Sequence, residues 1–360
     1  MKIAIILGTR PEIIKMSPII RFLEQSKTDF YILHTGQHYS YNLDKVFFEQ
    51  LKLPDAKYNL EVGSGSHAEE TARILVGIEK VLLDEQPYIV LVEGDTNSVL
   101  AGALASAKLH IKVGHVEAGL RSYDRRMPEE INRVLTDHCS DYLFAPTEKA
   151  KVILQGEGIP DEKIFVTGNT IVDAVHQNLE ITRKKGNTLS DLHVNPKEYF
   201  LVTLHRQENV DDRARLESIL RGLDELTDEF RLPVIYPAHP RSVKRMTEFN
   251  LQPKNVAMIE PVDFLSFLLL ESEAKLILTD SGGVQEEACI LGVPCMTLRD
   301  NTERPETLEV GANILAGAVP KTIIEHAHLM LKRKNDWGNP FGDGKAAERI
   351  VRIVMGDRDG

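Results

Sequence analysis

Short runs of apolar residues alternate with longer amphipathic stretches along the whole chain. The apolar runs are Ile3–Leu7, Ile89–Val92, Lys112–Val116, Tyr142–Ala145 and Ile164–Val166 in the first half, and Phe200–Leu204, Val234–Tyr236, Val256–Ile259, Leu276–Thr279 and Cys295–Leu298 in the second. Their Val, Ile and Leu content indicates strands that are buried on both faces. Strands separated by helical stretches predict βαβ units and parallel sheets. We therefore expect an α/β fold of two doubly wound, Rossmann-like domains with a cleft between them.

The predicted domain boundary follows Gly168-Asn169. The pattern of residues 170–185 predicts a helix, and the next stretch, 186–196, is polar and poor in strand-forming residues. This division gives an N-terminal domain of residues 1–170 and a C-terminal domain of residues 171–344. Ligands of such sheets bind beyond the carboxyl ends of the strands, which is where candidate site residues are expected.

A first candidate for anion binding directly follows the first strand, at Gly8-Thr9-Arg10-Pro11-Glu12. Pro11 suits the first turn of a helix, and Gly8 permits a tight turn into it. The helix N-terminus would offer free N–H groups to a phosphate, and Arg10 and Lys15 would add positive charge. An ordinary helix start with two solvated cations has the same pattern.

The second half has an equivalent strand-to-helix turn with Ser281, Gly282 and Gly283. Glycines let a phosphate approach the backbone closely, and the serine adds a hydroxyl donor. Glu286 and Glu287 follow one turn later, where they either favour the helix dipole or accept hydrogen bonds from the hydroxyls of a ribose. Two phosphate-type turns, one in each domain, predict a nucleotide-sugar ligand held across the cleft.

Carboxylates follow three predicted elements of the first domain. Asp95 and Glu117 come just after successive strands, and Glu129 lies at the start of the helix that follows. Each carboxylate could simply stabilise the first turn of a helix through its negative charge, and Glu130 with Arg133 could form an i,i+3 ion pair. Their common position at the carboxyl edge of one sheet instead favours acid–base catalysis.

His205 lies at a strand end of the second domain, in the half expected to face these carboxylates, and His239 is a weaker candidate of the same kind. No His, Cys or Asp spacing matches a zinc site, and no Gly-x-Ser-x-Gly elbow is present, so we expect neither a metal nor serine-hydrolase chemistry. The segment 63–65 is a single Gly-x-Gly without the third glycine, so we expect no NAD.

Composition narrows the class of protein further. The 360 residues include 43 Lys and Arg against 54 Asp and Glu, a net charge of −11, which argues against a nucleic-acid-binding protein. The 3 cysteines form no CxxC motif, which is typical of reduced thiols. The first apolar run is too short for a signal peptide or a membrane span, so we expect a cytoplasmic protein that does not bind membranes.

Seven segments together resemble one family. They are Gly8-Thr9-Arg10-Pro11-Glu12, Gly94-Asp95-Thr96, His115-Val116-Glu117-Ala118-Gly119-Leu120-Arg121, Pro128-Glu129-Glu130, His205-Arg206, Thr279-Asp280-Ser281-Gly282-Gly283-Val284-Gln285-Glu286-Glu287 and Thr302-Glu303-Arg304-Pro305-Glu306. In this order they resemble the non-hydrolysing UDP-N-acetylglucosamine 2-epimerases, and the resemblance extends from residue 2 to residue 344. It implies a glycosyltransferase B-type fold, with the C-terminal helix (about 345–360) returning to the first domain. It also implies a homodimer without a cofactor.

The reaction implied by the resemblance interconverts UDP-GlcNAc and UDP-ManNAc. UDP is eliminated together with the C2 proton, which leaves bound 2-acetamidoglucal, and UDP then adds back with protonation on the opposite face. Asp95 and Glu117 would handle the C2 protons on the two faces. Glu129 would steady the cationic character of the sugar or tune Asp95, and His205 would lie against the diphosphate.

Binding roles also carry over by position in the resemblance. The expected substrate contacts are Arg10 and Lys15 at the diphosphate, Ser281, Gly282 and Gly283 at the second phosphate turn, Glu287 at the ribose, Phe267 at the uracil and Arg304 at the nucleotide. Gln37, His38 and His239 match a site for a second, activating UDP-GlcNAc. The stretch 122–127 is shorter than in bacterial members. Ser40 stands where a longer polar residue is usual, and Val262 replaces a polar residue near the expected uracil pocket.

Several alternatives remain at this point. A hydrolysing epimerase would release N-acetylmannosamine and UDP, and a related enzyme would act on a 2,3-diacetamido UDP-sugar. A glycosyltransferase of the same fold is less favoured because nothing marks an acceptor site. A UDP-sugar-binding module without turnover would bind the nucleotide with Asp95 and Glu117 dispensable.

Overall fold

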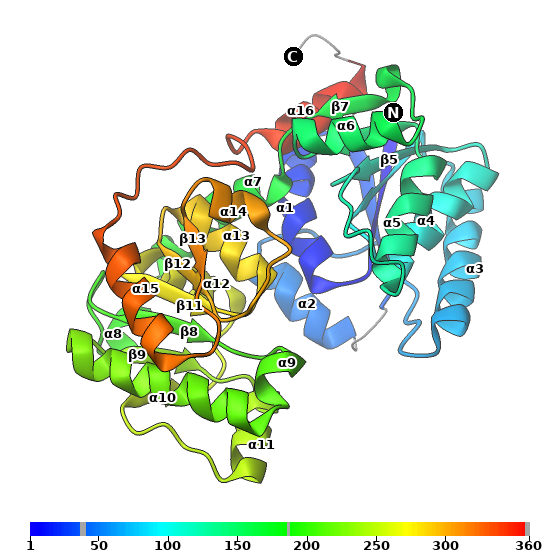
Figure 1. Cartoon of the computed structure of the whole chain (residues 1–360). Helices are drawn as coiled ribbons and strands as arrows, with labels where there is room; N and C mark the ends of the chain where they lie inside the picture. Colours follow the sequence, from blue (N-terminus) through cyan, green and yellow to red (C-terminus); the bar gives the residue numbers. More distant parts are fainter. Residues whose placement is uncertain (37–40, 186–187, 357–360) are drawn as a thin grey trace. The chain divides into compact units, whose positions relative to one another are not determined.

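The computed structural model describes residues 1–36, 41–185 and 188–356 (Figure 1). Its contacts divide the chain into two compact units, which we call unit 1 (Met1–Gln177 with Phe341–Gly360) and unit 2 (Asn178–Pro340). The first dividing point lies inside helix α7 (Thr170–Lys185), a little beyond the boundary expected from the sequence. No described helix has the length and apolar character needed to cross a membrane.

Unit 1 contains one parallel sheet of seven strands in the order β3-β2-β1-β4-β5-β6-β7. The strands are β1 (Lys2–Leu7), β2 (Asp29–His34), β3 (Tyr58–Asn59), β4 (Ile89–Glu93), β5 (Lys112–Val116), β6 (Tyr142–Ala145) and β7 (Ile164–Val166). β1 lies between β2 and β4, so the order reverses beside it as in a doubly wound sheet. The sequence analysis missed β2 and β3. β3 has only two residues, too few for a periodic pattern.

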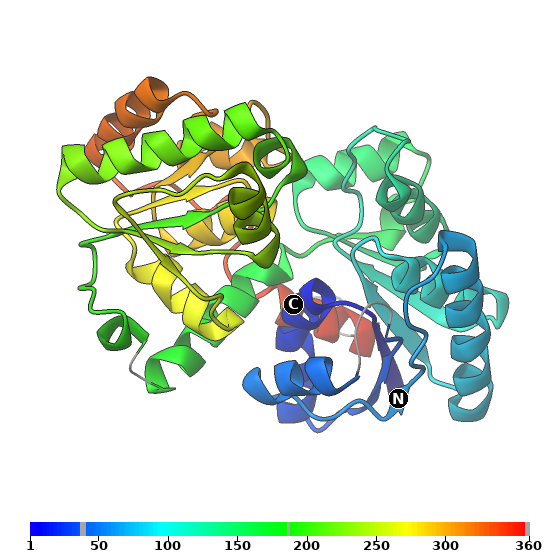
Figure 2. The same cartoon turned by 90° about the horizontal axis from the view of Figure 1, so that it is seen from below.

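Helices cover this sheet on both faces, as continuous apolar strands require. They are α1 (Arg10–Gln25), α2 (Tyr41–Gln50), α3 (His67–Glu85), α4 (Asn97–Lys108), α5 (Pro128–Cys139), α6 (Glu148–Gly156), the 3-10 turn η1 (Asp161–Lys163), the first part of α7, and α16 (Ala346–Met355). α3 packs on α4 and α4 on α5. Figures 1 and 2 both show the red α16 beside the dark blue α1, in agreement with the contacts between these helices. Alternate residues of β1, Ala4 and Ile6, pack with Ile74 of α3 and Val99 of α4.

Unit 2 contains a second parallel sheet, of six strands in the order β10-β9-β8-β11-β12-β13. The strands are β8 (Phe200–Thr203), β9 (Val234–Pro237), β10 (Val256–Ile259), β11 (Leu276–Thr279), β12 (Cys295–Thr297) and β13 (Asn313–Leu315). The sequence analysis missed β13, which has only three residues. The two parallel, helix-covered sheets confirm the predicted fold class of two Rossmann-like domains.

The helices of unit 2 are α8 (Thr188–Asp191), α9 (Gln207–Val210), α10 (Arg213–Phe230), α11 (Pro240–Phe249), α12 (Phe264–Glu273), α13 (Gly282–Leu291), α14 (Pro305–Glu309) and α15 (Pro320–Lys332), together with the end of α7. Alternation along β8 decides which helices cover which face. Phe200 and Val202 pack against α10 and α15, whereas Leu201 packs in a separate cluster with α12 and α13, together with Tyr199, which directly precedes the strand. α10 and α15 lie side by side in Figures 1 and 2.

The C-terminal helix α16 belongs to unit 1, and one buried carboxylate fixes its start. Asp173, on α7, accepts hydrogen bonds from the backbone N–H groups of Ala346 (3.2 Å) and Ala347 (3.0 Å). These N–H groups have no partner within the helix, because they belong to its first turn. Asp173 therefore caps a helix that is distant from it in sequence.

We expect the Asp173→Ala variant to lower the free energy of unfolding by about 1–2 kcal/mol, because two buried N–H groups lose their acceptor. Urea titration followed by circular dichroism measures the change. Glu348→Ala on the same helix is the control, since Glu348 forms an exposed i,i+4 pair with Arg352 and its removal should change stability by less than about 0.5 kcal/mol. Equal effects in both variants would contradict the capping role.

Candidate active site

The predicted carboxylates of unit 1 meet at one edge of its sheet. β1, β4 and β5 are adjacent and parallel, with Ile5 beside Leu91 and Glu93 beside Val116. Their carboxyl ends therefore lead into neighbouring turns, which carry Asp95 and Glu117. The parallel sheet brings these two residues to the same edge, as the sequence predicted.

The ammonium group of Lys15 lies between two carboxylates at this edge. Its Nζ is 2.5 Å from Oε2 of Glu117 and 3.2 Å from Oε1 of Glu93, and Glu93 is only 2% exposed. Burial raises the pKa of Glu93 well above its ordinary range; Lys15 opposes the shift, and the negative charges of Glu117 and Glu12 add to it. Lys15, expected from the resemblance at the diphosphate, is thus an ion-pair partner of a predicted catalytic carboxylate.

Glu117 has a left-handed backbone conformation, with φ at 69°. A glutamate rarely adopts this region, and such strain persists only where surrounding contacts fix it. The amide of Asn169 supplies a second contact, since its Nδ2 donates to Oε2 of Glu117 at 3.2 Å. The Glu117 side chain is therefore held by two donors from different elements.

Asp95 is partly exposed and pairs with Arg133 of α5. Asn132, one residue earlier, donates to the backbone oxygen of Asp95 at 3.0 Å. Arg133 also contacts Glu130, which is buried and accepts hydrogen bonds from the segment that precedes α5. Glu129 is exposed, and within the described parts of the chain no hydrogen bond or ion pair joins it to the other carboxylates.

A buried histidine ties the turns of Asp95 and Glu117 together. The ring of His115 contacts the carboxylate of Asp137 (2.6 Å) and the backbone oxygen of Gly94 (2.8 Å). Asp137 also pairs with Arg121 at 2.7 Å and accepts from the N–H of Gly119 at 3.3 Å. The sequence analysis missed Asp137, because its partners lie far away along the chain.

Glu12, the last residue of the first predicted anion-binding turn, is buried within that turn. It accepts hydrogen bonds from the N–H of Gly8 (2.6 Å) and the hydroxyl of Thr9 (2.9 Å). Burial raises the pKa of Glu12 to about 7, against hydrogen bonds that lower it, and the charge of Asp95 adds to the rise. Arg10 is exposed, with its guanidinium 5.8 Å from the centre of the Phe47 ring.

The predicted phosphate turn of unit 2 starts helix α13. Ser281 is the N-cap residue, and its N–H donates to the hydroxyl of Thr279 at 2.9 Å. A Cβ atom at Gly282 or Gly283 would meet no protein atom closer than 3.9 Å. Internal packing therefore does not require glycine at either position, and the absence of side chains leaves the backbone of this first turn uncovered.

His205 is held beside this turn by the buried carboxylate of Asp280. Asp280 accepts from the N–H groups of His205 (3.0 Å) and Arg206 (3.0 Å), and its Oδ1 is 3.1 Å from the His205 ring. Burial opposes ionisation of Asp280, yet these contacts lower its pKa. The ring of His239 lies 6.1 Å from that of His205, which is partly exposed.

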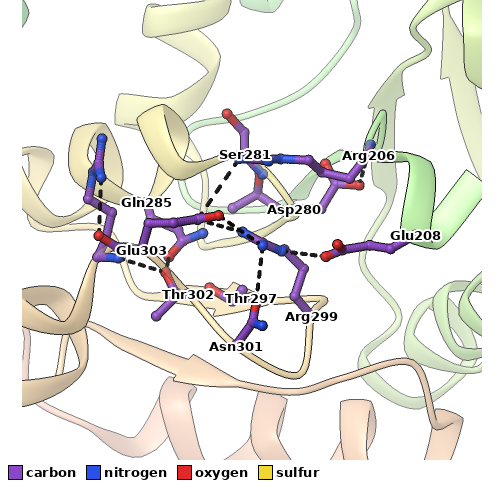
Figure 3. A network of polar contacts seen from close by, with 12 residues as sticks. Arg206, Glu208, Asp280, Ser281, Gln285, Thr297, Arg299, Asn301, Thr302 and Glu303 are labelled. Carbon is purple, nitrogen blue, oxygen red and sulfur yellow. Dashed lines mark hydrogen bonds and ion pairs between the residues drawn. The ribbon is translucent and has the colours of Figure 1, made fainter. Parts of the chain in front are cut away.

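Next to the phosphate turn, Arg299 is the centre of a polar network (Figure 3). Its guanidinium pairs with Glu208 (2.5 Å) and Glu303 (2.7 Å), and Glu303 lies 3.9 Å from Arg206. The hydrogen bonds from Arg299 lower the pKa of Glu303 to about 2. This network joins α9 to the loop that precedes α14, and the sequence analysis missed Arg299.

The remaining predicted contacts of unit 2 lie on α12, α13 and α14. Glu287 is 9% exposed and faces the fully buried Glu271, whose pKa is raised by burial and by Glu287. Phe267 is half-buried at the edge of the core cluster of α12 and α13. Arg304 pairs with Glu286 at 2.7 Å.

Two predicted activator residues, Gln37 and His38, lie outside the described residues. Among the residues that are described, no group of three or more His, Cys, Asp or Glu side chains is arranged to hold a metal ion.

Glu93 was adjacent in sequence to the predicted site, and Glu12 lay within a predicted motif. Their burial, which separates them from solvated carboxylates, became visible only in the fold.

We expect the Glu12→Gln variant to lose a pH dependence that the wild type has. Glu12 keeps its proton up to about pH 7 in the folded chain but only to about pH 4.5 when unfolded, so it contributes stability below pH 4.5 that is lost as pH rises through 7. Between pH 5 and 8 the wild type should lose about 2–3 kcal/mol more unfolding free energy than the variant. Urea titrations at several pH values measure the difference, and parallel curves would contradict it.

Comparison with known proteins identifies the family of this chain. A family model described as UDP-N-acetylglucosamine 2-epimerase matches residues 21–355. The UDP-N-acetylglucosamine 2-epimerase of Methanocaldococcus jannaschii is 60% identical over 98% of this chain and 99% of its own. A crystal structure of the M. jannaschii enzyme in complex with UDP-GlcNAc and UDP matches with a TM-score of 0.85 at 60% identity, covering 99% of each chain. The UDP-2,3-diacetamido-2,3-dideoxy-D-glucuronate 2-epimerase of Pseudomonas aeruginosa is 44% identical over 98% of this chain and 99% of its own. The resemblance is thus confirmed, and the chain belongs to the UDP-N-acetylglucosamine 2-epimerase family.

Proposed function

We propose that the protein interconverts UDP-GlcNAc and UDP-ManNAc by eliminating UDP and adding it back through a bound 2-acetamidoglucal. The observation that carries the proposal is the position of Asp95 and Glu117 at one sheet edge, each paired with a cation. Whole-chain identity of 60% to the M. jannaschii epimerase supports it independently. The M. jannaschii enzyme has been crystallised with UDP-GlcNAc and UDP.

Removal of the C2 proton is the difficult step, since no carbonyl group adjoins C2 to acidify this proton. A positioned carboxylate must accept it while the bond from C1 to the UDP oxygen breaks. We assign the two faces of C2 to Asp95 and Glu117, with one removing the proton and the other supplying one when UDP returns. Glu129 would steady the cationic character of the sugar or tune Asp95.

Departure of UDP as an anion requires donors that are already in place. We propose that the first-turn N–H groups of α13, at Ser281, Gly282 and Gly283, hold the diphosphate of UDP. His205, fixed by Asp280, would assist its departure and return. Arg10 and Lys15 would add positive charge from the other phosphate-type turn.

We propose that unit 2 also holds the nucleoside part of the substrate. Glu287 would accept hydrogen bonds from the ribose hydroxyls, Phe267 would contact the uracil, and Arg304 would contact the nucleotide. The half-buried Phe267 and the largely buried Glu287 belong to adjacent packed helices, α12 and α13, which supports their acting together.

Incubation with UDP-GlcNAc in deuterated water tests the function by proton NMR. We expect UDP-ManNAc with deuterium at C2. Free N-acetylmannosamine with UDP would instead identify a hydrolysing enzyme. Turnover only of a 2,3-diacetamido UDP-sugar would place it with the 44%-identical P. aeruginosa relative. UDP binding without exchange would identify a binding module.

The Asp95→Asn and Glu117→Gln variants should each lose about 100- to 10,000-fold in kcat, because each removes one acid–base group. UDP affinity, measured by calorimetry, should remain near that of the wild type. Glu225→Gln, at an exposed position of α10, is the control and should be fully active. Activity near that of the wild type in either site variant would contradict the assignment.

We further propose a homodimer that acts in the cytoplasm and is activated by a second UDP-GlcNAc near Gln37, His38 and His239. Three free cysteines, two of them buried, support a reducing compartment. Exposed apolar side chains on α3 and α5 support association: Val76 is 51% exposed, Ile131 42% and Leu135 47%. Ile131 also lines an apolar groove between these helices. Such a surface is typical of an interface.

The Ile131→Asp variant should therefore shift the protein toward monomer, because a charge on an apolar interface must be desolvated. Light scattering coupled to size exclusion measures the mass. Val152→Asp is the matched control: Val152 is an exposed apolar residue (64%) of α6, and its replacement should leave the mass unchanged. A wild-type mass equal to that of a single chain would reject the dimer.

A further inference from the structure

In the sequence, Asn169 marked only a domain boundary. In the structure, its side chain contacts Glu117, which together with Glu93 and Lys15 forms the carboxylate site of unit 1. It follows strand β7 and is 5% exposed. Its backbone N–H donates to the carbonyl of Phe341 at 2.9 Å, which joins it to the returning C-terminal segment. Both ends of its amide group also have partners, so position and orientation are determined.

The orientation of the amide follows from chemistry. The N–H of Ile171, in the first turn of α7, points at one end of the Asn169 amide at 3.0 Å. A backbone N–H can only donate, so this end must be the oxygen Oδ1. The other end is therefore the NH2 group, and it faces Oε2 of Glu117 at 3.2 Å. An ionised carboxylate can only accept hydrogen bonds, so the NH2 group of Asn169 and the carboxylate of Glu117 are a matched donor and acceptor.

Two donors thus converge on the same oxygen atom of Glu117. Lys15 of α1 approaches Oε2 to 2.5 Å and is itself held by the buried Glu93, while Asn169 approaches from the start of α7. This oxygen is held by two donors, on a residue whose φ of 69° departs from the common regions. Hydrogen bonds to a charged acceptor are stronger than neutral ones and define its direction.

We propose that Asn169 is a positioning residue for Glu117, which holds the carboxylate in the orientation that exchanges a proton with C2 of the sugar. This inference rests on the proposed function. Asn169 then has two separate roles. Its Oδ1 caps α7 by accepting from the N–H of Ile171, and its Nδ2 orients Glu117 for the reaction. The two roles can be separated, because Ser and Asp also cap helices but lack the amide donor.

The test compares Asn169→Ser and Asn169→Asp with the wild type in UDP-GlcNAc epimerisation. Both variants keep a capping oxygen, and both remove the donor to Glu117. We expect kcat to fall about 10- to 100-fold, the loss of one hydrogen bond to a charged group, with KM and the affinity for UDP within about twofold of the wild type. Asn169→Asp should fall further, because it places a second carboxylate beside Glu117.

Thermal unfolding of each variant separates this role from a structural one. Ser66→Ala is the control: Ser66 caps α3 through the N–H of Glu69, so its loss should lower the melting temperature without lowering kcat. Unchanged kcat in both Asn169 variants would overturn the inference, as would a fall in kcat matched by an equal rise in KM. If Asn169→Ser does not fold, the isosteric Asn169→Asp decides alone. A wild type without epimerase activity would instead reject the proposed function, and this inference with it.

Discussion

The ammonium group of Lys15 is the charge on which the carboxylate site of unit 1 depends. Glu93 is buried and Glu117 is nearly so, and like charges at such an edge repel strongly in a low dielectric. A buried carboxylate is tolerated when it is paired, hydrogen-bonded or protonated. Lys15 supplies the pairing for both groups at once. Helix α1 therefore has two functions: it covers the sheet, and its second turn carries Lys15, the cation that stabilises the two carboxylates.

The surrounding structure restricts movement of this site. His115 links the Asp95 turn to Asp137, which in turn contacts the Glu117 turn and Arg121. The two central partners are buried on regular elements, His115 on β5 and Asp137 on α5. Proton transfer to or from carbon requires short, well-directed contacts, and a site on such rigid elements needs little reorganisation during the reaction.

In unit 2, the feature of interest is how positive potential is provided around the start of α13. Under the proposed function, a diphosphate is bound by a chain whose net charge is −11, so positive potential has to be local. The start of α13 supplies N–H groups, while the nearby arginines 206, 299 and 304 are each paired with glutamates. These pairs fix the guanidinium groups in place. The network in Figure 3 therefore adds order around the phosphate turn with little added net charge.

The sequence by itself determined most strands of the two parallel sheets and the common sheet edge of Asp95 and Glu117, because residues that follow adjacent parallel strands must share an edge. It favoured Glu129 as the catalytic candidate, but it could not show that Glu129 is exposed and Glu130 buried, because neighbouring helical residues point about 100° apart and the packing of α5 selects which of them is buried. It also missed the contacts of Glu93, Asp137 and Asn169, whose partners are distant in sequence. Burial and pairing are properties of the surroundings, and only the tertiary structure assembles those surroundings.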